Sequence, residues 1–129
     1  MRIIQLIPLL VLLVVISGCD QTDNKLLIAN ETDHLLLYIP SKTDSIVGGA
    51  PVDGNHSIPR HGEKHVSVIG SWENMVQYNF NGKLWVITFD SDTLEKYGWE
   101  YVKSNNRYYS KQGFTLSDLK KANWEIRVK

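Results

Sequence analysis

The sequence is poor in cysteine and carries no excess of charge of either sign. It has one cysteine, Cys19, in 129 residues, so no disulfide can form within the chain. Its 14 basic residues balance its 14 acidic residues. A surface that binds nucleic acid carries clustered Lys and Arg, and the only basic pair here is Lys120-Lys121. We therefore expect no nucleic-acid partner.

Long apolar runs are absent except at the amino terminus. Arg2 is followed by residues 3–16, which are almost all aliphatic. A charged start followed by an apolar stretch is typical of an export signal. A helix that spans a bilayer needs about 20 apolar residues, and this run stops at Ser17 and Gly18. The pattern therefore predicts an export signal and disfavours a permanent membrane span.

The end of that run, Ile16-Ser17-Gly18-Cys19, resembles the bacterial lipobox. The resemblance implies a diacylglycerol on the sulfur of Cys19, cleavage before Cys19 by the lipoprotein signal peptidase, and acylation of the new amino terminus with a fatty acid such as palmitate. Two or more acyl chains hold a protein stably on a bilayer, whereas one chain holds it weakly. The alternatives are a buried cysteine behind a signal that is cleaved elsewhere, or an uncleaved anchor.

The lipobox divides the chain into three parts. Residues 1–18 form the expected lipoprotein signal peptide, residues 19–24 hold the lipidated Cys19 and a short polar spacer, and residues 25–129 form one domain. We expect a cell-envelope location, with the membrane reached through the lipid. Asp20 resembles an inner-membrane retention signal, yet Asp20 with Asp23 also fits a surface-export signal. The inner or outer membrane, and the periplasmic or surface face, therefore stay open.

The first half of the domain reads mainly as strands. Two apolar runs, residues 25–29 and 35–39, flank a polar turn and predict a hairpin. Residues 41–62 contain several Gly and Pro with little periodicity and predict a long loop. Residues 65–69 alternate as a strand does, and Asn81-Gly82 predicts a type I′ turn that joins strands at 75–80 and 83–89. The last of these is apolar on both faces, as a central strand is.

The second half of the domain adds helices. Residues 93–103 have helical spacing that Gly98 interrupts, so we expect a helix that bends or breaks there. Thr115 and Asp118 are typical of a capping box at a second helix, and Asn123 is suited to end it. Residues 124–128 alternate as a final strand. The fold class expected is α+β, with a mostly antiparallel sheet of about six strands and two short helices near the carboxyl terminus.

One cluster of side chains could bind a metal. His61, Glu63 and His65 are spaced by two, so in a strand they would share a face, and His56 could be a fourth ligand. A small metal-dependent hydrolase is therefore the alternative function. The competing interpretation is a solvated face, because Val66 and Val68 mark the opposite face as buried. We expect no cofactor.

The segment from Val86 to Leu94 resembles the strand and DxDxT motif of haloacid-dehalogenase-like phosphotransferases. In that family the first Asp attacks phosphorus and the second handles the leaving-group proton. The match departs by one residue, because Asp92 abuts Thr93. A helix start explains the same residues better, since carboxylates are favoured there.

Two further surface features could carry interactions. Arg107, Tyr108 and Tyr109 could form an exposed aromatic patch for a glycan or a protein of the envelope, although one tyrosine could instead pack in the core. Asp44-Ser45-Ile46 resembles the O-glycosylation sites of exported Bacteroidota proteins, which implies a glycan on Ser45.

A wider resemblance covers residues 84–128, above all 89–97 and 116–124, which are similar to small uncharacterised Bacteroidota lipoproteins. It implies no activity. We therefore expect a non-enzymatic, lipid-anchored envelope protein that acts as an accessory or binding module through residues 41–62 and 107–112. An inhibitor or immunity-type protein would have the same sequence features.

Overall fold

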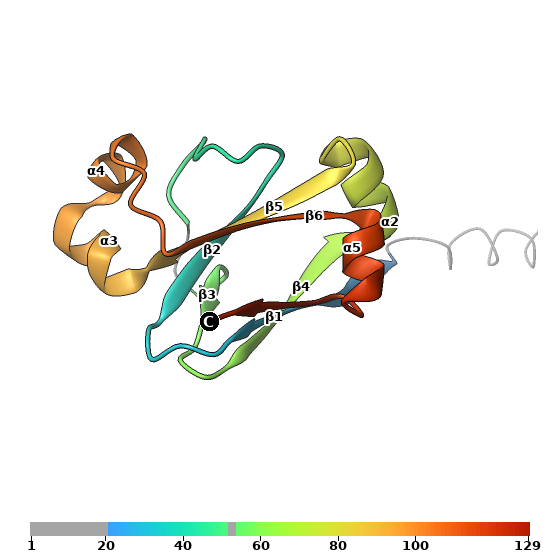
Figure 1. Ribbon diagram of the computed structural model, residues 1–129, viewed down its shortest axis with the longest axis horizontal. Coiled ribbons are helices and arrows are strands. Elements are labelled where there is room, and N and C mark those ends of the chain that lie inside the picture. Colours follow the sequence, from blue (N-terminus) through green and yellow to red (C-terminus); the bar gives the residue numbers. More distant parts are fainter. Residues whose placement is uncertain (1–20, 52–53) are drawn as a thin grey trace, which may run out of the picture.

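The computed structural model describes residues 21–51 and 54–129, and over these residues the strands form two sheets (Figure 1). One sheet has the order β4-β1-β7, built from β1 (Thr22–Asn30), β4 (Glu63–Ile69) and β7 (Glu125–Val128). The other has the order β3-β2-β5-β6, built from β2 (Leu36–Ser41), β3 (Ser57–Ile58), β5 (Lys83–Asp90) and β6 (Ser110–Thr115). The helices are α2 (Trp72–Asn74), the π-helix η1 (Met75–Asn79), α3 (Ser91–Tyr97), α4 (Trp99–Ser104) and α5 (Leu116–Lys121).

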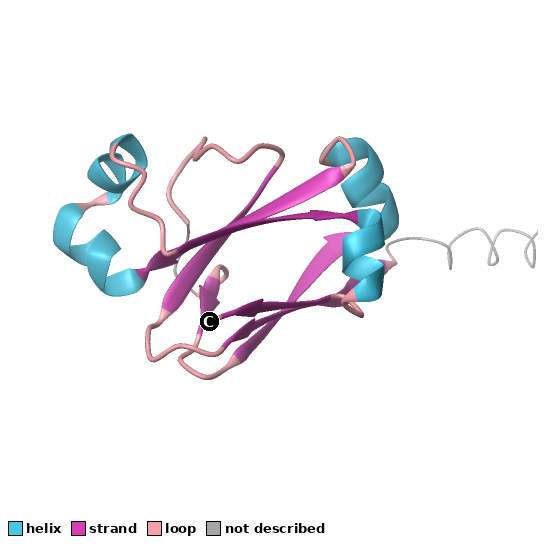
Figure 2. Cartoon of the chain, viewed as in Figure 1, coloured by secondary structure: helices cyan, strands magenta, loops and turns pink. Residues whose placement is uncertain are grey.

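The fold class is α+β, as predicted, but its layers differ from the prediction. The described residues hold seven strands in two mostly antiparallel sheets, with one parallel pair between β1 and β7. Helices α2 and η1 lie in the middle of the chain, so the helices are not confined to the carboxyl-terminal part. Figure 2 shows α2 and α5 at one end of the paired sheets and α3 and α4 at the opposite end.

The predicted signal peptide and Cys19 lie outside the described residues. Among the described residues, no helix is long and apolar enough to cross a membrane.

Strand β1 starts at Thr22 and so takes in the last three residues of the segment that the sequence marks as a spacer. Burial alone would raise the pKa of Asp23, but hydrogen bonds from the N–H groups of Trp72 and Lys25 and from the Lys25 side chain lower it.

The main hydrophobic core lies between the two sheets. Helices α2, η1 and α5 cover one end of it and supply the buried side chains Trp72, Val76 and Leu119. Each large apolar side chain that is fully buried contributes about 1.5–3 kcal/mol. The remaining members come from the strands: Leu26, Ile28, Leu36, Tyr38, Ile58, Leu84, Val86, Ile126 and Val128.

Strand β5 is buried on both faces, which confirms the prediction of a central strand. Leu84 and Val86 face the main core, whereas Ile87 and Phe89 belong to a second, smaller cluster with Val102 of α4. Strand β5 also has a hydrogen-bonded neighbour on each side, β2 and β6. Helices α3 and α4 therefore pack on the outer face of the four-stranded sheet.

The predicted hairpin of residues 25–29 and 35–39 is wrong, because β1 and β2 belong to different sheets. Strand β1 pairs with β4 and β7, whereas β2 pairs with β3 and β5. The chain crosses between the sheets just after Asn30, whose buried side chain binds backbone groups of both connecting turns. Both strands are then free to turn an apolar face toward the same core.

The predicted strand at residues 75–80 is also wrong, because this segment is helical. The Ser71 hydroxyl caps α2 by accepting from the N–H of Asn74 at 3.2 Å. Val76 is fully buried but Tyr78 is 74% exposed, so the apolar alternation does not mark one face. Asn81 and Gly82 have positive φ angles of 52° and 84°, as predicted, but they lead from η1 into β5.

The carboxyl-terminal elements match the predictions more closely. Gly98, with φ 81° and ψ 161°, separates α3 from α4. Thr115 and Asp118 form the predicted capping box of α5, and Asn123 has a positive φ of 54° just before the final strand β7. Two strands were not predicted: β3 has only two residues, and β6 is mostly polar and contains Gly113. An edge strand such as β6 needs no continuous apolar face.

Candidate ligand-binding surface

The tyrosine hollow is a surface depression of about 250 Å³ at the α3–α4 end of the molecule. Two stretches of the chain form it: the continuous stretch from the end of β5 into helix α3, and the loop between α4 and β6. Backbone hydrogen bonds fix the loop, because the Arg107 N–H donates to the Val102 carbonyl at 2.9 Å and the Tyr109 N–H donates to the Thr88 carbonyl at 2.7 Å. The lining residues are Asp90, Thr93, Tyr97, Arg107, Tyr108 and Tyr109.

Aromatic rings dominate this hollow and its rim. Tyr108 and Tyr109 are 39% and 37% exposed, so both rings of the predicted patch lie at the surface and neither packs in the core. Tyr97 lines the hollow and stacks on Tyr101 of α4, with ring centroids 4.9 Å apart and planes 22° apart. Exposed aromatic rings grouped in this way are typical of binding surfaces, since each offers a large apolar face and a polar hydroxyl.

Charged groups surround the rings. The Asp90 carboxylate caps α3 by accepting from the N–H of Asp92, and its Oδ2 lies 2.8 Å from Nδ1 of His34. The His34 ring in turn contacts Tyr109 at 5.5 Å between centroids. Lys111 lies 5.1 Å from the Tyr108 ring, and Arg107 is exposed. The hollow therefore combines apolar faces with hydrogen-bond donors and acceptors at its rim.

The structure also accounts for the DxDxT-like segment. Asp90 is the cap of α3, two residues earlier than Asp92, which lies exposed in the first turn. The Asp90 carboxylate is already engaged by the backbone of its own helix and by His34. The segment is thus a strand end joined to a capped helix, as the helix-start interpretation has it.

The metal-ligand candidates are distributed over different surfaces. His61 and Glu63 line a hollow of about 230 Å³ beside β7, whereas His65 and His56 line another of about 480 Å³ between β2, β4 and η1. The His65 ring nitrogen Nδ1 lies 3.1 Å from the Asn24 carbonyl, and the His56 ring contacts Tyr38. Over the described residues, no three His, Cys, Asp or Glu side chains are placed to hold one metal ion.

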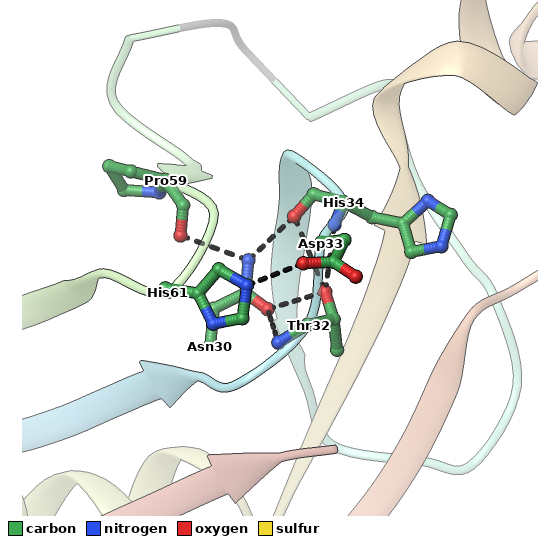
Figure 3. Close-up of polar contacts among 6 residues, drawn as sticks. All are labelled: Asn30, Thr32, Asp33, His34, Pro59 and His61. Atoms are coloured by element: carbon green, nitrogen blue, oxygen red, sulfur yellow. Dashed lines mark hydrogen bonds and ion pairs between the residues drawn. The ribbon is translucent and has the colours of Figure 1, made fainter.

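His61 belongs to a different polar cluster, which the sequence did not reveal (Figure 3). It has a positive φ of 50° in the turn before β4, and its Nε2 lies 2.5 Å from Asp33 Oδ1. This hydrogen bond holds the pKa of Asp33 below its ordinary value. The cluster joins the β1–β2 turn to the β3–β4 turn at the surface.

Beneath that pair, the Asn30 side chain joins the same two turns (Figure 3). Its Nδ2 donates to the carbonyls of His34, Ile58 and Pro59 at 2.8–3.2 Å, and its Oδ1 accepts from the N–H and hydroxyl of Thr32. An Asn followed by Thr after an apolar strand is a signal for such a side-chain turn. The role of this cluster is structural.

The proposed glycosylation residue lies in the connection between β2 and β3. Ser45 is exposed, and its N–H contacts the Thr43 hydroxyl at 3.4 Å. Ile46, next to it, is buried in the second apolar cluster and holds this part of the connection against the sheet. The Ser45 side chain is therefore accessible on an anchored segment.

Comparison with protein-family models, with curated proteins and with solved structures gives no match for this chain.

Proposed function

We propose that the protein is a lipid-anchored component of the cell envelope that acts as a non-catalytic accessory or binding module. The lipobox at residues 16–19 supports the anchor, through a diacylglycerol on Cys19. The tyrosine hollow supports the binding role. The observation that carries it is the grouping of Tyr97, Tyr108 and Tyr109 with Arg107 and Asp90 around one depression.

The ligand chemistry that best fits this hollow is a saccharide of the envelope. Small ligand sites combine apolar or aromatic faces with a few placed polar groups. A sugar ring presents C–H groups that can lie on the Tyr108 or Tyr109 ring, and hydroxyls that can bind the Arg107 guanidinium and the tyrosine hydroxyls. A stable protein interface needs about 800 Å² on each partner, so a protein partner would have to extend beyond the hollow.

The test uses two tyrosines at opposite ends of the fold. The full acylated chain in detergent is mixed with isolated peptidoglycan sacculi or with purified lipopolysaccharide, and the bound fraction is measured by sedimentation. Tyr108→Ala should weaken binding about tenfold, equivalent to about 1.4 kcal/mol for the lost ring contact. Tyr78→Ala is the matched control, because Tyr78 is even more exposed and lies on η1.

Equal losses in both variants, or no binding by the parent protein to either glycan, would count against a saccharide site. A photo-reactive residue placed at position 108 in living cells then tests whether the hollow binds a protein instead. Reproducible cross-links to one envelope protein from position 108, and none from position 78, would assign the hollow to a protein partner. No cross-link from either position would contradict the binding role.

A further inference from the structure

The fold holds the start of its first strand firmly. The Gly70 N–H donates to the Gln21 carbonyl at 2.8 Å, and Thr22 pairs with Ile69 across the β1–β4 ladder. Asp23 accepts from the N–H of Trp72 at 2.9 Å. The chain therefore enters the fold beside α2, at the end that also carries η1 and α5 (Figure 1). We call this the near end, and the end with α3 and α4 the far end.

Very little chain separates this fixed point from the proposed lipid. Cys19 is two residues before Gln21, and two extended residues reach about 7 Å. The polar headgroup layer on each side of a bilayer is about 5–8 Å thick. A glyceride on Cys19 places the sulfur close to that layer. The near end must then lie against the membrane surface, since the connection is too short to hold it away.

The near end carries the side chains that such a surface favours. Ile69 and Tyr78 are 75% and 74% exposed, the highest values among the exposed large hydrophobic side chains of the described residues. Tyrosine is enriched at membrane interfaces, where its ring meets apolar chains and its hydroxyl meets water. Lys120 and Lys121 of α5 are exposed at the same end and suit anionic headgroups.

The acidic groups at the near end are partly compensated by lysines. Lys25 forms an ion pair with Asp23 at 3.2 Å and a second, shorter one with Glu73. The single ammonium group of Lys25 compensates only one of these two carboxylates, and Asp118 of α5 is also exposed at this end. Lys120 and Lys121 offset the two remaining negative charges, so the proposed contact with a bilayer rests mainly on Ile69, Tyr78 and the short connection to the lipid.

We propose that the near end rests on the bilayer, with Ile69 and Tyr78 at headgroup depth, and that the tyrosine hollow at the far end faces away from it. This inference rests on the proposed lipidation of Cys19. The exposed tyrosines thus divide into two groups with different surroundings: Tyr78 at the membrane, and Tyr97, Tyr101, Tyr108 and Tyr109 toward the envelope space.

The single cysteine makes this orientation measurable. Because the sulfur of Cys19 carries the diacylglycerol in the proposed protein, the thiol of an added cysteine is the only one that a fluorescent maleimide can modify. Full-length acylated Ile69→Cys and Tyr78→Cys are labelled and reconstituted in vesicles of phosphatidylethanolamine and phosphatidylglycerol that contain a headgroup-attached nitroxide quencher. The control is Tyr97→Cys, an exposed tyrosine of the far end. Circular dichroism before reconstitution confirms that each variant is folded.

The expected result is strong quenching of the labels at positions 69 and 78, at least about fivefold above that at position 97, because the nitroxide acts only over a distance comparable to the headgroup layer. Vesicle flotation is measured on the same samples. Protein that floats with the vesicles but shows equal quenching at all three positions would overturn the orientation and leave the anchor standing. Protein that does not float would refute the anchor and the orientation together.

Discussion

Replacing Asn30 with alanine should lower the free energy of unfolding by about 2–4 kcal/mol. Asn30 is only 2% exposed, and its side chain contacts three carbonyls and two donor groups of Thr32. The two Nδ2 hydrogens and the Oδ1 oxygen allow four full hydrogen bonds, each worth about 1 kcal/mol net, and buried groups left unpaired cost about 1–3 kcal/mol. Water that reaches the partly buried carbonyls recovers part of this loss.

Urea unfolding followed by tryptophan fluorescence measures the change, since Trp72 is buried in the main core. Asn79→Ala is the control, because Asn79 is exposed on η1 and surface substitutions change stability by about 0.5 kcal/mol or less. If Asn30→Ala and Asn79→Ala unfold at the same urea concentration, the Asn30 cluster does not hold the two sheets together.

Asn30→Asp tests the same hydrogen bonds through the pH dependence of stability. The replacement has the same shape, but its carboxylate would face the three carbonyl oxygens that now accept from Nδ2. Burial and this repulsion would raise the folded-state pKa of the new carboxyl, so the variant should be least stable at neutral pH. Its deficit relative to the parent should shrink as the pH falls toward about 4, where the unfolded carboxyl protonates. A deficit that is independent of pH would contradict the assigned geometry.

Three further outcomes follow from the structure. Gly98→Ala should destabilise the fold by about 1–3 kcal/mol in urea unfolding, since φ 81° with ψ 161° is a conformation that only glycine adopts easily. Gly49→Ala is the control: Gly49 has open space around it, so its replacement should change the free energy of unfolding little. The Lys25 side chain lowers the pKa of Glu73 by its hydrogen bond and helps to lower that of Asp23. These carboxylates stabilise the fold fully above pH about 4, and they stabilise it less as the pH falls through their lowered pKa values. Lys25→Met should therefore be less stable than the parent at pH 7 and equal to it in acid. A difference in stability that is the same at every pH would refute the ion-pair network. Elemental analysis of the purified full chain should give substoichiometric zinc without chelators, because the candidate ligands lie apart, and one zinc per chain would revive the metal-dependent alternative.

Local signals in the sequence predicted the elements that local chemistry controls. The break at Gly98, the capping box of Thr115 and Asp118, and the left-handed Asn123 all depend on residues within one helical turn. The alternating strand β4 was found for the same reason, since its exposed and partly buried residues alternate along its length. Such features are visible in sequence because the backbone groups that they satisfy are close by.

Predictions failed where distant residues decide the structure. The alternation of Val76, Tyr78 and Phe80 looks like a strand, but packing of Val76 against distant strands of the main core favours a helical segment, which the local cap at Ser71 also indicates. The turn after Asn30 looks like a hairpin loop, but contacts with Ile58 and Pro59 direct the chain into the other sheet. No short-range pattern contains this information.

The candidate site was predicted in part for the same reason. The sequence predicted an exposed patch at Tyr108 and Tyr109, because the two residues lie in a short polar segment between a helix and a strand. The contributions of Asp90, Tyr97 and His34 could not be predicted, because only the packing of α3 and α4 on the sheet brings them beside the loop.

Intact mass spectrometry of the native protein, purified from the membrane fraction of its own cells, is the decisive experiment for the lipid anchor on Cys19. We expect a polypeptide that begins at Cys19 and carries the added mass of a diacylglycerol, with a further fatty acid where the amino terminus is acylated. A native chain that begins at any other residue, or a Cys19 without the glyceride, would contradict the anchored module and the orientation inferred from it.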